Sequence, residues 1–236
     1  MGYFYGLKLS GGNMAEYSAF DVIGPIMIGP SSSHTAGAAR LGLAANRVAG
    51  DKIKSVKFLL HGSFAKTYKG HGTDRALLAG VLGFSERDER LRQAMELASD
   101  QGVSYTFIPA DLGDVHPNSV TIEMETESGE IVTMSGSSIG GGSIQIWDVN
   151  GFAVDMTGEK PVMLTRHRDR EGVISGVTRI LASLGINIVS LNCSRKEKRG
   201  EASMVIELDE MLDERILKVI TTRVVGIEAI TLIDQL

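Results

Sequence analysis

The sequence predicts an α+β fold in two parts, and three patterns along its 236 residues support this prediction. Apolar and polar residues alternate over 120–125, as in a strand with one face toward water. Four apolar residues follow the spacing of one helical face: Leu91, Ala94, Met95 and Ala98. From about residue 161 the expected elements run β-α-β-β-α-β. Separate helices combined with hairpin-forming strands are typical of the α+β class.

The first predicted domain spans residues 15–156. Its helices are expected over residues 33–49, 73–83 and 86–101. Its strands are expected over residues 54–61, 104–109, 119–127, 130–136 and 143–149. Ser128-Gly129 separates two of these strands and indicates a hairpin turn. We interpret this region as a mixed α/β domain, and the family resemblance described below implies a domain of the substrate-binding type.

The second predicted domain spans residues 161–236. Its elements are expected at 161–166 (strand), 171–184 (helix), 187–194 and 201–208 (strands), 212–223 (helix) and 227–234 (strand). This order is that of the ferredoxin-like split βαβ fold. Thr157-Gly-Glu-Lys-Pro161 has the composition of a linker, so the domain boundary is expected near 156–160.

The first 14 residues share no period with the rest of the chain. Residues 1–13 precede a second methionine, Met14, and we interpret residues 1–14 as a leader of vector origin. A basic start with an apolar core is absent, and no apolar stretch reaches about 18 residues, the length of a membrane span. These patterns predict a cytoplasmic protein.

Charge and cysteine content exclude several classes. The net charge of -5 argues against nucleic acid as a partner. Cys193 is the one cysteine, which excludes an intrachain disulfide and a cluster held by three or four cysteines of this chain. Cys193 itself is expected to be a small buried apolar residue on a strand.

Two polar motifs point to a site. In Ile28-Gly-Pro-Ser-Ser-Ser-His-Thr-Ala-Gly37, hydroxyls and His34 precede a predicted helix. One serine suffices to cap a helix, so the surplus hydroxyls predict a site for an anion or a reacting group. The second motif follows a predicted strand as a turn that leads into a helix, and it contains Gly62-Ser63, Gly70-His71 and Thr73-Asp74. Helix capping alone could explain one such polar turn, but it does not explain two turns that both carry a histidine and several hydroxyls.

Together these motifs resemble the β subunit of iron–sulfur-dependent L-serine dehydratase, from about Ala19 to the C-terminus. The Gly-Pro-Ser-Ser-Ser-His-Thr string is specific to this resemblance. Arg170-Glu-Gly172 and Gly185-Ile-Asn-Ile188 similarly resemble an ACT domain, although Glu171 stands where many ACT domains have proline. The resemblance implies conversion of L-serine to pyruvate and ammonia in serine catabolism and gluconeogenesis, and it leaves threonine open as a second substrate.

The resemblance also implies partners and a cofactor. A [4Fe–4S] cluster is expected on a partner α subunit and not on this chain, and no metal is expected on the chain itself. The chain is then a subunit that is not active alone. ACT domains often pair side by side and bind amino acids at the paired interface, so self-association and a small amino-acid ligand are expected. An ACT domain that only helps dimerisation remains an alternative.

Removal of the serine Cα proton needs a base near pH 7, which suits imidazole. We predict His71 and His34 as the catalytic residues and favour His71 as the base. His34 is expected to bind the substrate. The expected substrate-binding residues are Ser31, Ser32, Ser33, Thr35, Thr73, Asp74 and Asn118.

Two other functions compete with this hypothesis. The first domain also resembles the allosteric substrate-binding domain of some D-3-phosphoglycerate dehydrogenases, which favours a non-catalytic serine-sensing module. A self-sufficient hydrolase is disfavoured because no convincing third member of a serine–histidine triad can be placed in the sequence.

Overall fold

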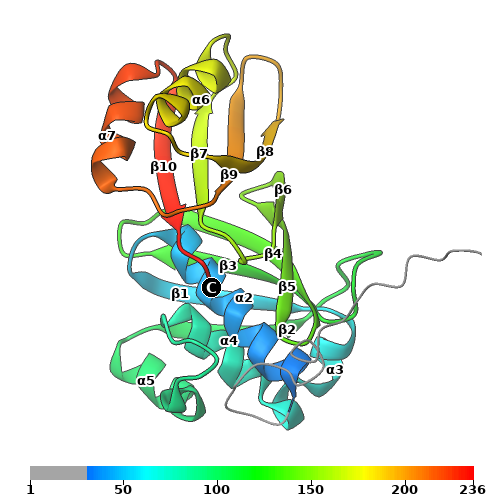
Figure 1. The fold of residues 1–236 in the computed structure, drawn as a ribbon. Coiled ribbons are helices and arrows are strands. Elements are labelled where there is room, and N and C mark those ends of the chain that lie inside the picture. The colour runs from blue at the N-terminus through cyan, green and yellow to red at the C-terminus, as the bar shows by residue number, and fades with distance from the viewer. Residues whose placement is uncertain (1–30) are drawn as a thin grey trace, which may run out of the picture.

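Two β-sheets form the framework of the protein (Figure 1). The structure, a computed structural model, describes residues 31–236. The predicted leader and the expected start of the first domain at residue 15 lie outside the described residues. The α+β class is confirmed.

The first sheet has six strands in the order β2-β1-β3-β4-β5-β6. Only β1 and β2 run parallel; each remaining neighbouring pair is antiparallel. The strands are β1 (Ile53–Leu60), β2 (Ser104–Pro109), β3 (Ser119–Thr126), β4 (Ile131–Gly140), β5 (Ser143–Val149) and β6 (Phe152–Met156).

Helices cover one face of this sheet. They are the π-helical turn η1 (Ser32–Ala36), α2 (Gly37–Ala49), α3 (Gly62–His71), α4 (Thr73–Val81), the 3-10 turn η2 (Glu89–Gln93) and α5 (Ala94–Asp100). On β1, Val56, Phe58 and Leu60 alternate with polar or half-buried residues, and all three lie in the core beneath the helices. The alternation therefore fixes which face of β1 the helices cover.

The helices α2 and α4 pack unusually closely. A Cβ atom on Gly80 of α4 would overlap the carbonyl oxygen of Ala39, and one on Gly42 of α2 would overlap the carbonyl oxygen of Leu77. Alanines and leucines fill the remaining contact. Glycine is required at both positions because the two backbones leave no room for a side chain.

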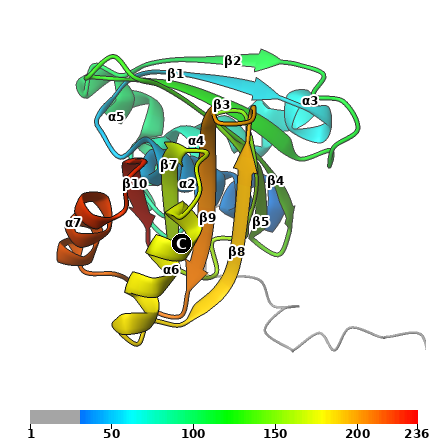
Figure 2. The same ribbon diagram turned by 90° about the horizontal axis from the view of Figure 1, so that it is seen from above.

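The second sheet has the order β10-β7-β9-β8 with every neighbouring pair antiparallel. Its elements are β7 (Val162–Arg168), α6 (Val173–Ser183), β8 (Ile188–Arg195), β9 (Glu201–Leu208), α7 (Glu214–Arg223) and β10 (Ile227–Ile233). Viewed from above, α6 and α7 lie on the side of this sheet away from β1 and β2 (Figure 2). The predicted ferredoxin-like arrangement is confirmed.

The uncovered face of the second sheet packs against the first part of the chain. Val162, Val205 and Ile233 belong to the same apolar core as the α2–β1 region. Residues 157–161, where we expect the domain boundary, connect β6 to β7. The C-terminal residue lies beside α2 (Figure 1), where the Arg40 guanidinium donates to the Leu236 carbonyl over 3.2 Å.

Four expectations need correction. Residues 62–71 form α3 rather than a turn. Strand β6 was not expected. The helix expected over 86–101 is divided into η2 and α5. Cys193 is exposed rather than buried, because β8 is the edge strand of its sheet and most of the residues of β8 are exposed.

Within residues 31–236, the structure contains no helix of the length and apolar character needed to cross a membrane.

Replacing Gly80 with alanine should destabilise the protein by about 1–3 kcal/mol, the usual cost of overpacking. The added methyl group has to displace the backbone of α2. Urea unfolding followed by circular dichroism measures the change. Gly70→Ala is the matched control, because a Cβ on Gly70 of α3 meets none of the described atoms within 4 Å. That control should stabilise the protein by up to about 1 kcal/mol through helix propensity. Equal effects of the two changes would contradict the close α2–α4 contact.

Candidate functional site

The described part of the first motif, residues 31–37, contains the turn η1, which precedes α2. Ser31 has extended backbone and caps η1, its Oγ accepting the His34 backbone N–H over 3.1 Å. A single serine therefore performs the capping, as the sequence analysis anticipates. The hydroxyl groups of Ser32 and Ser33 are left for other roles.

His34 is held by serine hydroxyls at both of its ring nitrogens. Its Nδ1 lies 3.1 Å from Ser33 Oγ and 3.5 Å from Ser31 Oγ. Its Nε2 lies 3.0 Å from the Oγ of Ser63, near the start of α3. The ring also meets Phe64 edge to face, with centroids 5.5 Å apart. These contacts fix the orientation of the imidazole and join the two polar motifs.

His71 is the last residue of α3 and lies beside His34. The two ring centroids are 5.0 Å apart, with the rings inclined at 73°. The Thr35 hydroxyl donates to the His71 carbonyl oxygen over 3.3 Å, and Gly72 ends the helix in the left-handed conformation. The His71 side chain is exposed. The structure thus brings both predicted catalytic histidines to one place.

The electrostatic environment favours neutral His34. Burial lowers the pKa of His34 below its ordinary value, and the neighbouring His71 lowers it further. Nearby, burial raises the pKa of the Asp74 carboxyl, although the Arg75 backbone N–H opposes this by donating to it. Both shifts disfavour the charged forms at this end of the molecule.

The other predicted substrate-binding residues differ in their surroundings. Thr73 at the start of α4 is fully buried, and its Oγ1 has no hydrogen-bond partner among the described residues. The Oδ1 of Asn118 is also buried without a partner in that part of the chain. Ser32 is half-buried, and its carbonyl oxygen accepts the Gly37 N–H.

Two residues of this region were missing from the predicted site. Ser63 forms a hydrogen bond with His34. The sequence feature that could have identified it is its position directly after Gly62 in the second motif. Ser138 on β4 is fully buried, and its Oγ has no partner within residues 31–236. Its backbone N–H donates to the Asn118 carbonyl oxygen over 2.9 Å, and its side chain lies against Gly37 of α2. Ser138 thus belongs to the same polar region as Asn118 and the start of α2.

The described residues do not fit an iron–sulfur cluster. Within residues 31–236 no three His, Cys, Asp or Glu side chains are grouped so that they could hold a metal ion. Cys193 lies on β8 of the second sheet, whereas His34 and His71 lie on η1 and α3 of the first part of the chain. No thiolate of the described chain is therefore available beside the two histidines.

Both parts of the chain are similar to known proteins. The family described as "Serine dehydratase beta chain" matches residues 18–148, and the ACT domain family matches residues 162–223. The chain is 43% identical over 219 residues to the L-serine dehydratase beta chain of Peptoniphilus asaccharolyticus, covering 92% of this chain and 97% of that protein. It is 44% identical over 204 residues to a probable L-serine dehydratase beta chain of Bacillus subtilis, covering 86% and 92%. D-3-phosphoglycerate dehydrogenase of Bacillus subtilis is 28% identical over 199 residues, covering 84% of this chain and 37% of the enzyme.

The His34 pKa should respond to its neighbour in a defined direction. In NMR titration, His34 should titrate below 6.5, and His71→Asn should raise its pKa without restoring the ordinary value, since burial is the larger cause. Lys66→Asn, a change of an exposed residue on α3, should leave the pKa of His34 unchanged. The folded state binds the His34 proton less readily than the unfolded chain, so this group's contribution to stability is lost as pH falls through about 6.5. A His34 pKa above 6.5 would contradict the described environment.

Proposed function

Because the chain belongs to the family of serine dehydratase beta chains and carries an ACT domain, we propose that it is the β subunit of an L-serine dehydratase. The subunit contributes to the conversion of L-serine to pyruvate and ammonia. One observation carries this proposal: His34, Ser63 and His71 come from two separate motifs but are in contact, close to the residues where α2 and α4 begin.

The reaction removes the Cα proton and the Cβ hydroxyl of serine as water. The resulting aminoacrylate tautomerises to an imine, which water hydrolyses to pyruvate and ammonia. The difficult step is abstraction of the weakly acidic Cα proton, and a correctly placed general base accelerates such a step by about 10²–10⁴. The chain must therefore offer a neutral base that can reach the substrate.

His71 is the base in this proposal. Its ring is exposed, and no described side chain occupies a ring nitrogen by hydrogen bonding. His34 has both ring nitrogens engaged by serine hydroxyls, which suits a residue that positions its neighbour and the substrate. The two histidines thus have separate roles, although they lie side by side.

The polar groups around the histidines bind the substrate. Ser31, Ser32, Ser33 and Thr35 line the start of α2, and Asp74 follows on α4, where its carboxylate can accept the substrate ammonium. The unpartnered oxygens of Thr73, Asn118 and Ser138 supply further hydrogen bonds. A buried polar atom without a partner costs stability, so a ligand that satisfies it gains affinity.

The complete active site is shared with an α subunit, which holds the [4Fe–4S] cluster. Iron supplies charge stabilisation at the serine hydroxyl and carboxylate when such a subunit is bound. The exposed His71 ring is compatible with a partner that closes over it. In this arrangement the β subunit alone is inactive.

Self-association through the ACT domain is supported by the exposed edge strand β8, which presents Val189 and Leu191 to solvent.

A regulatory module without catalysis is the second candidate. The similarity to D-3-phosphoglycerate dehydrogenases across most of this chain favours it. Such a module would bind serine but would contribute no base. Pull-down distinguishes the two: capture of an iron–sulfur subunit whose turnover needs this chain supports the lyase.

Replacing His71 with asparagine should reduce turnover of the assembled complex by about 100-fold or more, because the base is lost. The complex is obtained by coexpression with an α subunit of the family and assayed without oxygen for pyruvate formed from L-serine. Iron content and complex formation are measured in parallel and should not change.

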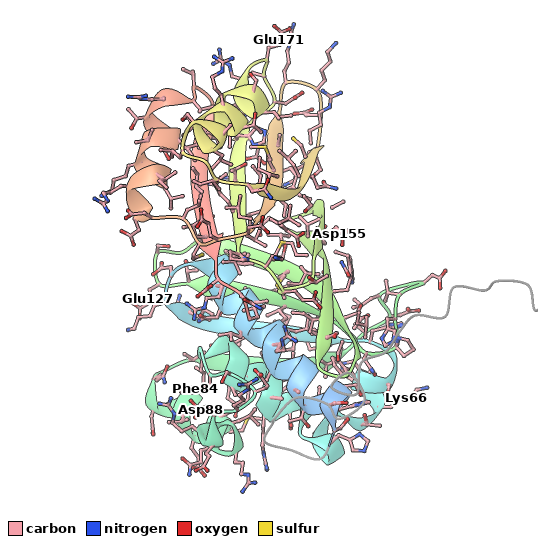
Figure 3. The ribbon with its side chains drawn as sticks, in the orientation of Figure 1. Lys66, Phe84, Asp88, Glu127, Asp155 and Glu171 are labelled. Carbon is pink, nitrogen blue, oxygen red and sulfur yellow. The ribbon has the colours of Figure 1, made fainter. Side chains whose placement is uncertain are left out.

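Lys66→Asn is the matched control, since Lys66 is exposed on the same helix (Figure 3). It should retain near wild-type turnover. If the His71→Asn complex turns over serine at the wild-type rate, His71 is not the base. If no α subunit of the family gives activity with the wild-type chain while the chain binds serine, the regulatory module is supported instead.

A further inference from the structure

A cleft of about 360 Å³ lies between the two sheets and is separate from the histidine site. Its walls come from the end of α2, from β4 and the β5–β6 turn, and from the face of the second sheet that α6 and α7 leave uncovered. Asp155 of β6 lies at the level where the two sheets meet, whereas Glu171, in the loop where ACT domains are expected to receive ligands, lies at the outer end of the molecule (Figure 3). The cleft is therefore neither the predicted active site nor the ACT loop.

The floor of the cleft places a cation, a hydroxyl and an anion close together. Arg166 on β7 lies directly opposite Ser203 on β9. Glu201 lies two residues before Ser203 on the same strand, so its side chain points to the same face, about 7 Å away. All three line the cleft. Such a set can receive a carboxylate and an ammonium at the same time.

Ser203 has the character of a binding residue. It is only 5% exposed, and no described group forms a hydrogen bond with its hydroxyl. The same strand face continues with Val205, which is packed into the core against the first part of the chain. A serine in this position leaves a polar atom facing the cleft, where a valine would have continued the apolar face.

The charged groups at the cleft already have ionic partners. Arg166 lies 3.0 Å from Glu130 at the β3–β4 turn and 3.8 Å from Glu228 on β10. Lys196 lies 3.7 Å from Glu201 and over the Phe152 ring at 4.6 Å. These pairs are half-exposed and worth little by themselves, so a ligand can share or replace them at small cost. Both signs of charge are therefore accessible to a ligand.

The remaining walls are mixed. Thr133, Asn150 and Thr231 add polar groups, whereas Leu164 and Ala229 are apolar. Leu164 lies two residues before Arg166 on β7, and Ala229 of β10 pairs with Arg166, so the apolar part of the wall lies beside the guanidinium. A ligand whose carboxylate binds Arg166 therefore places its side chain against this apolar part, which favours a small hydrocarbon side chain.

We propose that the cleft between the sheets binds a small aliphatic α-amino acid. Its carboxylate is bound by Arg166 and the Ser203 hydroxyl, its ammonium by Glu201, and its side chain lies against Leu164 and Ala229. The regulatory role of this ligand rests on the proposed lyase function, because the activity that it would regulate is that of the assembled enzyme. Binding itself needs only this chain, so failure of binding and failure of the pyruvate assay are separate results.

Isothermal titration of the full chain with L-valine tests the proposal. L-Valine should bind, whereas isobutylamine and isovalerate, which each lack one of the two charges, should bind at least tenfold more weakly. Arg166→Met and Ser203→Ala should each weaken L-valine binding at least tenfold. Ala229→Leu, which fills the cleft, should abolish it. Thermal melting verifies that each variant is folded.

Two controls separate binding from structural change. Lys160→Met removes a cation near the start of the same strand but outside the cleft, where Lys160 pairs with Asp209 at 3.3 Å, and should leave binding unchanged. Glu130→Gln breaks the same ion pair as Arg166→Met but keeps the guanidinium, and should also retain binding. No L-valine binding, binding that survives in Arg166→Met and Ser203→Ala, or tighter binding of L-serine than of L-valine would overturn the proposal.

Discussion

The close packing of α2 is the constraint on which the rest of the molecule depends. This helix lies against α4 on one side and against the first sheet on another, and nine of its 13 residues are buried. Glycines at 42 and 80 allow the two backbones to touch, and alanines allow the same approach to the sheet. Because α2 cannot shift without losing these contacts, whatever is attached to its ends is held in place. The histidine site lies at its first turn, and the cleft between the sheets at its last.

The polar groups near the first turn of α2 are of two kinds, those that already have hydrogen-bond partners and those that have none. Thr73, Asn118 and Ser138 keep oxygens away from solvent without a partner in the described chain, and native proteins leave few such groups. The hydroxyls around His34, by contrast, satisfy one another and the imidazole. In the proposed function, the satisfied groups hold the histidines in place and the unsatisfied oxygens bind the substrate. The two roles are thus distinguished by whether a polar atom already has a hydrogen-bond partner.

Periodicity predicted most of the elements, and it failed where local signals conflict. In α3 the sequence Gly-Ser-Phe-Ala-Lys-Thr-Tyr-Lys-Gly-His has glycines near both ends, which resemble turn signals, and tertiary contacts override them: the Ser63 N–H donates to the Pro117 carbonyl oxygen. Strand β6 is five residues long, too short to show a period. The two histidine motifs were predictable from composition. Their meeting was not, since it depends on how α3 lies against η1, and Ser138 is contributed by a strand about a hundred residues away.

Arg40 connects the two parts of the chain at the first turn of α2. Its guanidinium donates to the Gly142 carbonyl oxygen after β4 and to the Leu236 carbonyl oxygen after β10. The Leu236 N–H in turn donates to the Gly158 carbonyl oxygen over 3.0 Å. A planar guanidinium fork fixes direction as well as distance, so a rotation of the second sheet must break these bonds or carry α2 with it. A helix of 13 residues, about 20 Å long, moves as one body. In the proposed regulation, a ligand in the cleft would contact the last turn of α2, and this one rigid element would connect it to His34 before the first turn.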